Sequence, residues 1–145
     1  YARSLRCHTV SLSCNTGSEI GKCAELAIEV VVGPEILTGS TRLKSGTCQK
    51  LVLNMISTAS MVGIGKCYNN LMVDVMQSNE KLKVRAQNIL IDVAGITRQE
   101  ASEVLERAGG SVKKAIVMVL ASCSAEQAEE RLVAAKGHVR KAYLG

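Results

Sequence analysis

The sequence predicts an α/β protein in which a strand–helix–strand unit and a long apolar helix precede a bundle of short helices. The first observation is a pair of β-branched segments, residues 8–13 and 27–32, on either side of a short helical segment. The second is a run at 51–64 that is apolar nearly all round a helix. The third is a change in the sequence pattern at residue 79, after which capping residues and glycines separate successive amphipathic stretches.

Composition narrows the classes of function. The chain has 145 residues, of which 47% are hydrophobic and 21% are charged, as in a soluble globular protein. It contains three Tyr and no Phe or Trp, so it lacks the aromatic platforms on which single-stranded nucleic acids stack. The net charge of +5 suits an anionic small ligand, but the basic residues are scattered and form no patch. We therefore expect no nucleic-acid partner.

The six cysteines follow no metal-binding pattern. No two of them have C-x-x-C spacing and the chain has two His, so we expect no metal site and six reduced, mostly buried thiols. The most apolar run, 51–64, is too short and too often interrupted by polar residues to span a membrane. Residues 1–5 read as the last turn of a helix and do not suggest a signal peptide. These features predict a cytoplasmic protein with no membrane partner.

The N-terminal part should form a right-handed strand–helix–strand unit. Residues 8–13 and 27–32 are the two strands, and Ser18 begins a helix that runs to about Glu25. Parallel strands usually lie in larger sheets that are covered on both faces, and two strands alone would leave open edges. We therefore expect further strands to come from residues upstream of Tyr1 or from a partner chain.

A long helix is expected at 40–66, with Ser40 or Thr41 as its N-cap. Because 51–64 is apolar on several sides, this part should be mostly buried between the sheet and another subunit or domain, and should contribute to a homodimer. Residues 68–78 are expected to form an irregular connection.

The chain is expected to divide into two domains, residues 1–78 and 79–145. The second domain should hold four helices, because four helix starts can be recognised in it. These starts are Asn79, the capping box that opens at Thr97, Ser111, and the capping box that opens at Ser124.

Part of this helical domain resembles a ubiquitin-associated (UBA) three-helix fold. The resemblance lies in the spacing of Ala101, Gly109-Gly110 and Ala115 within residues 95–120. We interpret the stretch as a packing module that supports the main domain, with the binding of a partner as the alternative.

The most informative segment is GPEILTGSTRLKSGTCQKLVLN, at residues 33–54. It combines a strand end, a tight Pro-containing loop, and a helix N-terminus rich in Ser, Thr and basic residues. Backbone N–H groups, hydroxyls and the helix dipole at such a point favour an oxygen-rich anionic ligand. Open α/β sheets also bind their ligands beyond the carboxyl ends of the strands. The alternative is an N-cap that serves its own helix alone.

This segment carries a resemblance to a known family. The run GPE-x-L-x-GSTRLK-x-GT-x-x-K-x-x-x-N is similar to the signature shared by N-acetylmuramic acid 6-phosphate etherases and glucokinase regulatory protein. The flanking segments SLSCN and YNNLMVDV resemble the bacterial etherases in particular. Positions that resemble the second half of a sugar isomerase (SIS) domain are Asn15, Ser18, the turn at 24–25, the GPE at 33–35, and Ser40-Thr41. The resemblance covers essentially the whole chain. It implies the C-terminal half of a SIS-type parallel α/β sandwich, followed by a small UBA-like helical bundle.

The resemblance also implies an activity. Such an etherase is a cytoplasmic carbon–oxygen lyase that splits N-acetylmuramic acid 6-phosphate, a phosphorylated amino sugar, into N-acetylglucosamine 6-phosphate and D-lactate. The family chemistry is elimination followed by addition of water, which needs two Glu in different protonation roles and no metal or other cofactor. In the family these Glu and a Ser-rich phosphate loop lie before the position of Tyr1. We therefore assign no catalytic residue in this chain.

The residues expected to contact the substrate lie in the loop before the long helix. They are Glu35, Thr38, Gly39, Ser40, Thr41 and Lys44. For Glu35 the alternative is that it pairs with Arg42 or Lys44 and only fixes the loop.

Arg6 departs from the family pattern, because this helix-end position usually holds Gly. If a left-handed conformation is required there, the arginine should cost roughly 1 kcal/mol.

Two other classes of function are compatible with the sequence. One is a non-catalytic sugar-phosphate sensor like glucokinase regulatory protein, which has two SIS copies. The other is a helical interaction module in which residues 95–120 recruit a partner.

Overall fold

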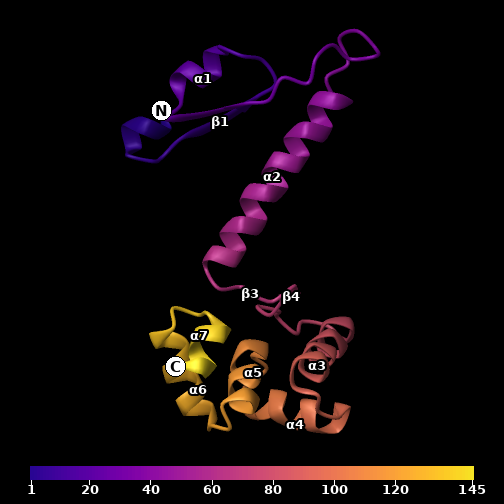
Figure 1. Ribbon diagram of the computed structural model, residues 1–145, viewed down its shortest axis with the longest axis vertical. Helices are drawn as coiled ribbons and strands as arrows, with labels where there is room; N and C mark the ends of the chain where they lie inside the picture. Colours follow the sequence, from indigo (N-terminus) through magenta and orange to yellow (C-terminus); the bar gives the residue numbers. More distant parts are fainter. The chain divides into compact units, whose positions relative to one another are not determined.

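The computed structural model describes residues 1–145 and contains two compact units, Tyr1–Thr58 and Ala59–Gly145 (Figure 1). The protein is a mixed helix–strand structure with one small parallel sheet, compatible with the predicted α/β class. The boundary between the compact units follows Thr58 and so lies before residue 78, because Tyr68 and Val73 join the core of the helices that follow them. The domains 1–78 and 79–145 stay a prediction.

The first unit contains the predicted parallel strand–helix–strand arrangement. Strand β1 (Val10–Ser13) pairs in parallel with strand β2 (Leu26–Glu29), and helix α1 (Glu19–Cys23) packs against both. Ser18 caps α1 as expected, since its hydroxyl accepts a 3.1 Å hydrogen bond from the Gly21 N–H. The sheet has two strands, so one edge of each strand is unpaired.

The first residues form a short 3-10 helix, η1 (Ala2–Leu5), that ends at Arg6. Arg6 has φ 60° and ψ 25°, which is the left-handed conformation expected at this position. Its backbone N–H donates to the carbonyl groups of Ala2 and Arg3, so the conformation ends the helix as a glycine would.

Helix α2 spans Lys44–Gly63, so the predicted start at Ser40 is wrong by four residues. Turns occupy the preceding segment: the Ser40 N–H donates to the Leu37 carbonyl at 3.0 Å, with Gly39 at φ 84°. The Thr41 carbonyl then accepts from the Gly46 N–H at 2.9 Å. Ser40 and Thr41 therefore belong to the loop and do not cap the helix.

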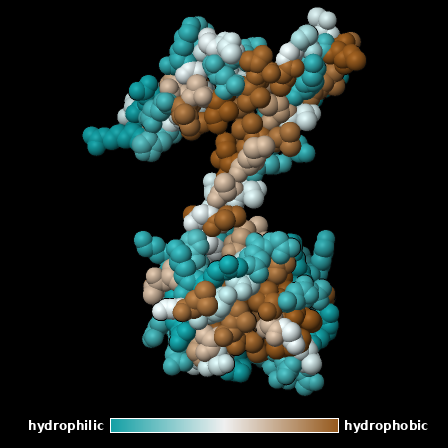
Figure 2. All heavy atoms as spheres, in the orientation of Figure 1, coloured by the Kyte–Doolittle hydropathy of each residue, from teal (hydrophilic) through white to brown (hydrophobic).

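The expected burial of residues 51–64 is also wrong for the chain by itself. No residue of α2 is buried, and Met55 and Val62 remain 65% and 52% exposed. Figure 2 shows apolar side chains uncovered along this helix. A two-stranded sheet is too narrow to cover a helix of 20 residues.

The connection after α2 is more regular than expected. Strands β3 (Cys67–Tyr68) and β4 (Leu71–Met72) form a small antiparallel hairpin, with Asn69 in the turn at φ 52°. An ion pair of 2.8 Å joins Lys66 and Asp74 beside it. The hydrogen bond from Lys66 and the charges of Lys113 and Lys66 keep the pKa of the Asp74 carboxyl below its usual value, although partial burial opposes the shift.

Five helices make up the rest of the second unit, one more than predicted. They are α3 (Glu80–Ala94), α4 (Arg98–Arg107), α5 (Val112–Leu120), α6 (Ala125–Ala134) and α7 (Val139–Leu144). The four predicted starts are confirmed, since the side chains of Asn79, Thr97, Ser111 and Ser124 each accept a hydrogen bond from a backbone N–H three residues on. Residues 95–120, which were expected to form a UBA-like three-helix fold, hold two helices, α4 and α5, and both pack against α3.

Helix α7 was missed because its N-cap, His138, makes no side-chain capping bond. Tertiary contacts hold this helix instead. The Tyr68 and Tyr143 rings meet edge to face with centroids 6.2 Å apart, and the Arg140 guanidinium donates to the Asn69 side chain at 2.6 Å.

The last four helices form an internal repeat. Residues 97–118 and 124–145 align with a displacement of 27 positions, so α6 and α7 correspond to α4 and α5. Each copy opens with a capping box. Each also turns at a glycine of positive φ, Gly110 at 81° and Gly137 at 79°, whose N–H donates back across the turn at 2.8 Å.

The two copies also bury corresponding side chains. The buried pairs are Ala101 and Ala128, Leu105 and Leu132, Val112 and Val139, and Ala115 and Ala142. A shared cap, turn and core show that α4–α5 and α6–α7 are equivalent helix pairs.

All six cysteines are free thiols, as expected, but the expectation that most are buried is wrong. Cys7 and Cys23 are exposed, and the other four are half-buried. No helix of the structure has the length and apolar character that a membrane crossing requires.

Candidate functional site

The candidate site is the loop between strand β2 and helix α2, and its centre is Glu35. One carboxylate oxygen of Glu35 accepts from the Lys44 N–H and the other from the Ser45 N–H, both at 2.9 Å. These backbone hydrogen bonds, with that from Ser45 the larger influence, lower the pKa of Glu35 below its usual value. Glu35 therefore caps α2 from a position nine residues before its first turn.

Because of this arrangement, the N-terminus of α2 does not offer the free backbone N–H groups that were predicted to meet an anionic ligand. The N–H groups of Gly46 and Thr47 donate to the carbonyl groups of Thr41 and Leu43. Together with the two bonds to Glu35, they leave none of the first four helical N–H groups free. The carboxylate occupies the place where an anionic ligand would meet the amides.

The hydroxyl groups of the loop have no such partners. Thr38 and Thr41 are exposed and Ser40 is half-exposed, and none of the three side chains makes a hydrogen bond within the chain. Gly39 lies between them in a turn, and its φ of 84° suits a residue without a side chain. The loop thus offers three free hydroxyl groups to a polar ligand.

Lys44 adds a positive charge to this loop. Its ammonium group donates to the Val32 carbonyl at 3.3 Å and lies beside Gly33, where an added Cβ would be 4.0 Å from Nζ. It makes no ion pair with Glu35, whose oxygens are taken by backbone N–H groups. The backbone contacts of Glu35 thus support the alternative that this residue only fixes the loop. The predicted pairing of Glu35 with the side chain of Arg42 or Lys44 is not formed.

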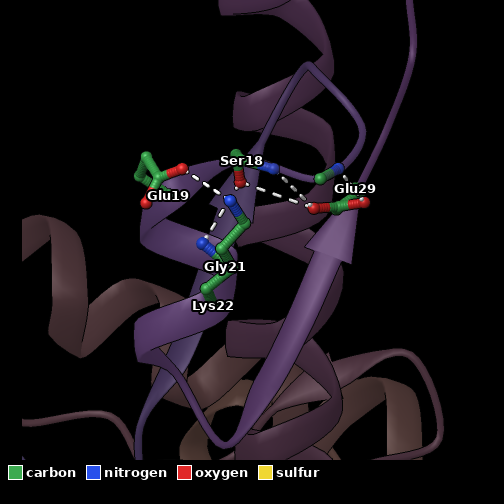
Figure 3. A network of polar contacts seen from close by, with 6 residues as sticks. Ser18, Glu19, Gly21, Lys22 and Glu29 are labelled. Atoms are coloured by element: carbon green, nitrogen blue, oxygen red, sulfur yellow. Dashed lines mark hydrogen bonds and ion pairs between the residues drawn. The ribbon is translucent and has the colours of Figure 1, made fainter.

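A second carboxylate, Glu29, lies at the end of β2 and was not singled out from the sequence. It accepts from the Gly17 N–H at 3.0 Å and from the Ser18 N–H at 3.3 Å (Figure 3). The Ser18 hydroxyl, which also caps α1, lies within 3.4 Å of it. The only sequence signal was the charge of Glu29 inside an otherwise apolar strand. Glu29 closes the turn before α1 as Glu35 closes the loop before α2.

Two thiols connect the end of β1 to helix α2. The Cys14 thiol lies 3.8 Å from the Ser45 carbonyl oxygen. Partial burial, the neighbouring Cys14 charge and a hydrogen bond with Cys14 raise the pKa of the Cys48 thiol above its usual value. A half-buried thiol whose pKa is raised, as at Cys48, favours packing over nucleophilic chemistry.

The fold and the loop define the class of site. The site lies in an α/β unit and consists of free hydroxyl groups and a lysine beyond the carboxyl end of a parallel strand. Its two carboxylates, Glu29 and Glu35, both accept hydrogen bonds from backbone N–H groups. Such a surface can bind the oxygens of a phosphorylated or polyhydroxylated ligand.

Comparison with known proteins identifies proteins that are similar in sequence to this chain. No family model matches the chain. The chain is 58% identical over 142 residues to the N-acetylmuramic acid 6-phosphate etherase of Geobacillus thermodenitrificans (strain NG80-2). Etherases of the same name from Geobacillus sp. (strain WCH70) and Bacillus thuringiensis subsp. konkukian (strain 97-27) are 57% and 56% identical over 142 residues. Each match covers 98% of this chain and 48% of the relative, so the chain spans about half the length of the curated relatives it matches. The resemblance to N-acetylmuramic acid 6-phosphate etherases predicted from the sequence is confirmed.

Proposed function

We propose that this chain provides half of an N-acetylmuramic acid 6-phosphate etherase, a lyase that releases D-lactate and leaves N-acetylglucosamine 6-phosphate. The observation that carries the proposal is the 58% identity, over 98% of the chain, to a protein of that name. The loop before α2 supports it, because its free hydroxyl groups and lysine suit a phosphorylated amino sugar.

In this proposal the loop forms one wall of the substrate site. Thr38, Ser40 and Thr41 would donate hydrogen bonds to sugar or phosphate oxygens, Gly39 would allow close backbone approach, and Lys44 would supply positive charge. Both oxygens of Glu35 are already bonded to backbone N–H groups, so its predicted contact with the substrate would be secondary to holding this wall in place.

The chemical step needs groups that this wall does not offer. A base removes the proton at C2, the bond from C3 to the lactyl oxygen breaks, and an acid protonates that oxygen. Water then adds across the new double bond. Each acid–base contribution is worth roughly 10²–10⁴ in rate, so the chain by itself should not turn over the substrate.

We further propose the finer architecture that the resemblance implies. The unpaired edges of β1 and β2 would receive additional parallel strands and complete a SIS-type sandwich. The exposed apolar side chains of α2 would be covered in a homodimer, and the second unit would be a UBA-like bundle. A cytoplasmic location follows from the proposed substrate.

A chimera tests the proposal. Residues 1–145 replace the matching half of the Geobacillus thermodenitrificans etherase, and release of D-lactate from N-acetylmuramic acid 6-phosphate is measured. We expect the chimera to release D-lactate and the separate chain to release none. A folded chimera without activity would contradict the proposal, and activity of the separate chain would show that acid and base lie within it.

A further inference from the structure

Two of the six cysteines lie at the same place in the first unit, where the end of β1 meets the start of helix α2. Cys14 directly follows the last residue of β1, and Cys48 lies in the second turn of α2. The Cys14 sulfur lies 3.8 Å from the carbonyl oxygen of Ser45, which is in the first turn of α2 and 31 positions further along the chain. The fold therefore brings Cys14 onto the helix that carries Cys48.

This contact also places the two sulfur atoms close together. In an α-helix the γ atom of a side chain can reach the carbonyl oxygen three or four residues earlier, and Cys48 follows Ser45 by three. The Cys48 sulfur is thus within reach of the carbonyl oxygen that Cys14 contacts. Partial burial, the Cys14 charge and a hydrogen bond between the two thiols raise the pKa of Cys48, and that hydrogen bond requires direct contact between the thiols.

The other four cysteines have no second thiol as a hydrogen-bond partner. Cys7 and Cys123 each lie against a backbone carbonyl group that is nearby in the sequence, at 4.0 and 3.8 Å. The fold thus pairs Cys14 with Cys48 alone. Both are half-buried and not fully enclosed, so a small oxidant can reach them from solvent.

We propose that Cys14 and Cys48 form a redox switch, in which a peroxide oxidises the two thiols to a disulfide that ties the end of β1 to helix α2. Cys14 reacts first, because the raised pKa of Cys48 disfavours the Cys48 thiolate and the thiolate is the nucleophile. Cys48 reacts second, at a sulfur atom with which it is already in contact.

The proposed step conserves atoms and electrons. The Cys14 thiolate attacks an oxygen of hydrogen peroxide, the O–O bond breaks, and Cys14 becomes a sulfenic acid, while the released hydroxide takes up the proton that the thiol lost. The Cys48 sulfur then attacks the Cys14 sulfur, the S–S bond forms, and hydroxide leaves with the proton of Cys48 as water. The two thiols have then lost two electrons and two protons, and one hydrogen peroxide has become two waters.

The disulfide would act on the loop before α2. Ser45, whose carbonyl oxygen the Cys14 thiol contacts, donates its N–H to Glu35 at 2.9 Å, and Glu35 holds that loop. The sulfur atoms of a disulfide are about 2.05 Å apart, much closer than two thiols in contact. Oxidation therefore draws the first turns of α2 toward the end of β1 and changes the surroundings of Ser45.

Peroxide treatment of the full chain tests the switch. The reduced chain is exposed to hydrogen peroxide and its intact mass is measured. Free thiols are then blocked with iodoacetamide, and the tryptic peptides are analysed without a reductant. We expect a loss of about 2 Da, the mass of two hydrogen atoms, and peptide 7–22 joined to peptide 45–50. Peptide 7–22 also contains Cys7, which should carry the iodoacetamide label. Dithiothreitol should restore the original mass.

Matched variants and unfolding make the test specific. Cys14→Ser and Cys48→Ser should each abolish the loss of mass, and Cys23→Ser, at an exposed position outside the pair, should retain it. In Cys48→Ser the sulfenic acid of Cys14 has no thiol to react with, so dimedone should label Cys14 at least about tenfold more than in the unchanged chain. In urea the fold no longer pairs the two cysteines, so their disulfide should lose its preference over other pairs.

Several outcomes would overturn the proposal. They are the absence of a disulfide under conditions that oxidise the exposed Cys7, another cysteine pair that forms as fast as Cys14–Cys48, and an equal yield of the Cys14–Cys48 disulfide in urea. Dimedone labelling of Cys48 in Cys14→Ser that is as strong as labelling of Cys14 in Cys48→Ser would contradict the order of the two reactions.

Discussion

Glu35 and Lys44 are joined by a 2.9 Å hydrogen bond from the backbone N–H of Lys44 to a carboxylate oxygen, across nine positions of the sequence. The contact fixes both ends of the loop that carries Thr38, Ser40 and Thr41. It also explains why helix α2 begins at Lys44 and not at Ser40, since a distant carboxylate replaces the local cap.

Removal of this contact should loosen the start of α2. In Glu35→Ala the Lys44 and Ser45 N–H groups lose their acceptor, and we expect their amide hydrogen exchange to become at least tenfold faster. The exchange of Leu82, which is capped by Asn79, is the internal control. Unchanged exchange at Lys44 would show that the bond contributes nothing to helix α2.

The same contact should make the first unit sensitive to acid. The pKa of Glu35 is lower in the folded chain than in the unfolded chain. The stabilisation is therefore fully present above the unfolded-state pKa of Glu35, and it is lost as the pH falls through the folded-state pKa. The advantage of the wild type over Glu35→Gln, measured by denaturant unfolding, should therefore shrink as the pH falls below about 4.5. An advantage that stays constant down to pH 3 would contradict the role of the charged form.

Gly21 should not tolerate a side chain. An added Cβ would lie 2.9 Å from a Glu29 oxygen and 3.0 Å from the Ser18 hydroxyl, in the contacts that close the turn before α1 (Figure 3). We expect Gly21→Ala to lower the free energy of unfolding by about 1–3 kcal/mol, measured with urea. Gly63→Ala is the matched control, since no atom lies within 4 Å of an added Cβ there and the residue is helical. A neutral Gly21→Ala would show that Glu29 can move away without cost.

Lys136 is a position where glycine should be better. It has φ 51° and corresponds, in the repeat, to Gly109 with φ 64°. Lys136→Gly should raise the free energy of unfolding by up to about 1 kcal/mol, because a left-handed conformation strains any residue with a Cβ. Lys136→Ala keeps the strain and should show no such gain. A destabilised Lys136→Gly would mean that the two turns are not equivalent.

Cys48 should be among the slowest thiols to react. Its pKa is raised by burial and by the neighbouring Cys14, and the thiolate is the nucleophile. Alkylation at pH 8, followed by mass spectrometry, should label the exposed Cys7 well before Cys48, and Cys14→Ser should speed the labelling of Cys48. Labelling of Cys48 as fast as Cys7 would contradict this.

Local signals in the sequence predicted the parts of the fold that depend on neighbouring residues. The starts of α3 to α6 were predicted because each cap bonds to an N–H three residues away. The glycine usual at the position of Arg6 raised the question of a left-handed conformation, and the structure shows that conformation there. The start of α2 could not be predicted, since Glu35 acts from outside the helix, and α7 was missed because its contacts are tertiary.

That the loop before α2 contacts the substrate stays a prediction, and the structure changes part of the chemistry expected of it. The loop lies beyond the strand end and carries free hydroxyl groups, but its helix amides are already bonded. Burial of α2 was inferred from its apolar composition and was expected to need another subunit or domain, and the two strands of this chain alone do not cover the helix. The repeat was missed because its two copies share core positions and turn geometry more than surface residues.

The Michaelis constant of the chimeric etherase tests the central claim, that the loop before α2 is a wall of the sugar-phosphate site. Ser40→Ala with Thr41→Ala removes two free hydroxyl groups, and Ser57→Ala on α2 serves as the control. Each hydrogen bond to a charged phosphate oxygen is worth about 1.5–3 kcal/mol, so the double variant should raise KM for N-acetylmuramic acid 6-phosphate by at least about tenfold and retain measurable kcat. The control should leave KM unchanged. An unchanged KM in a folded, active double variant would reduce this loop to a structural connection.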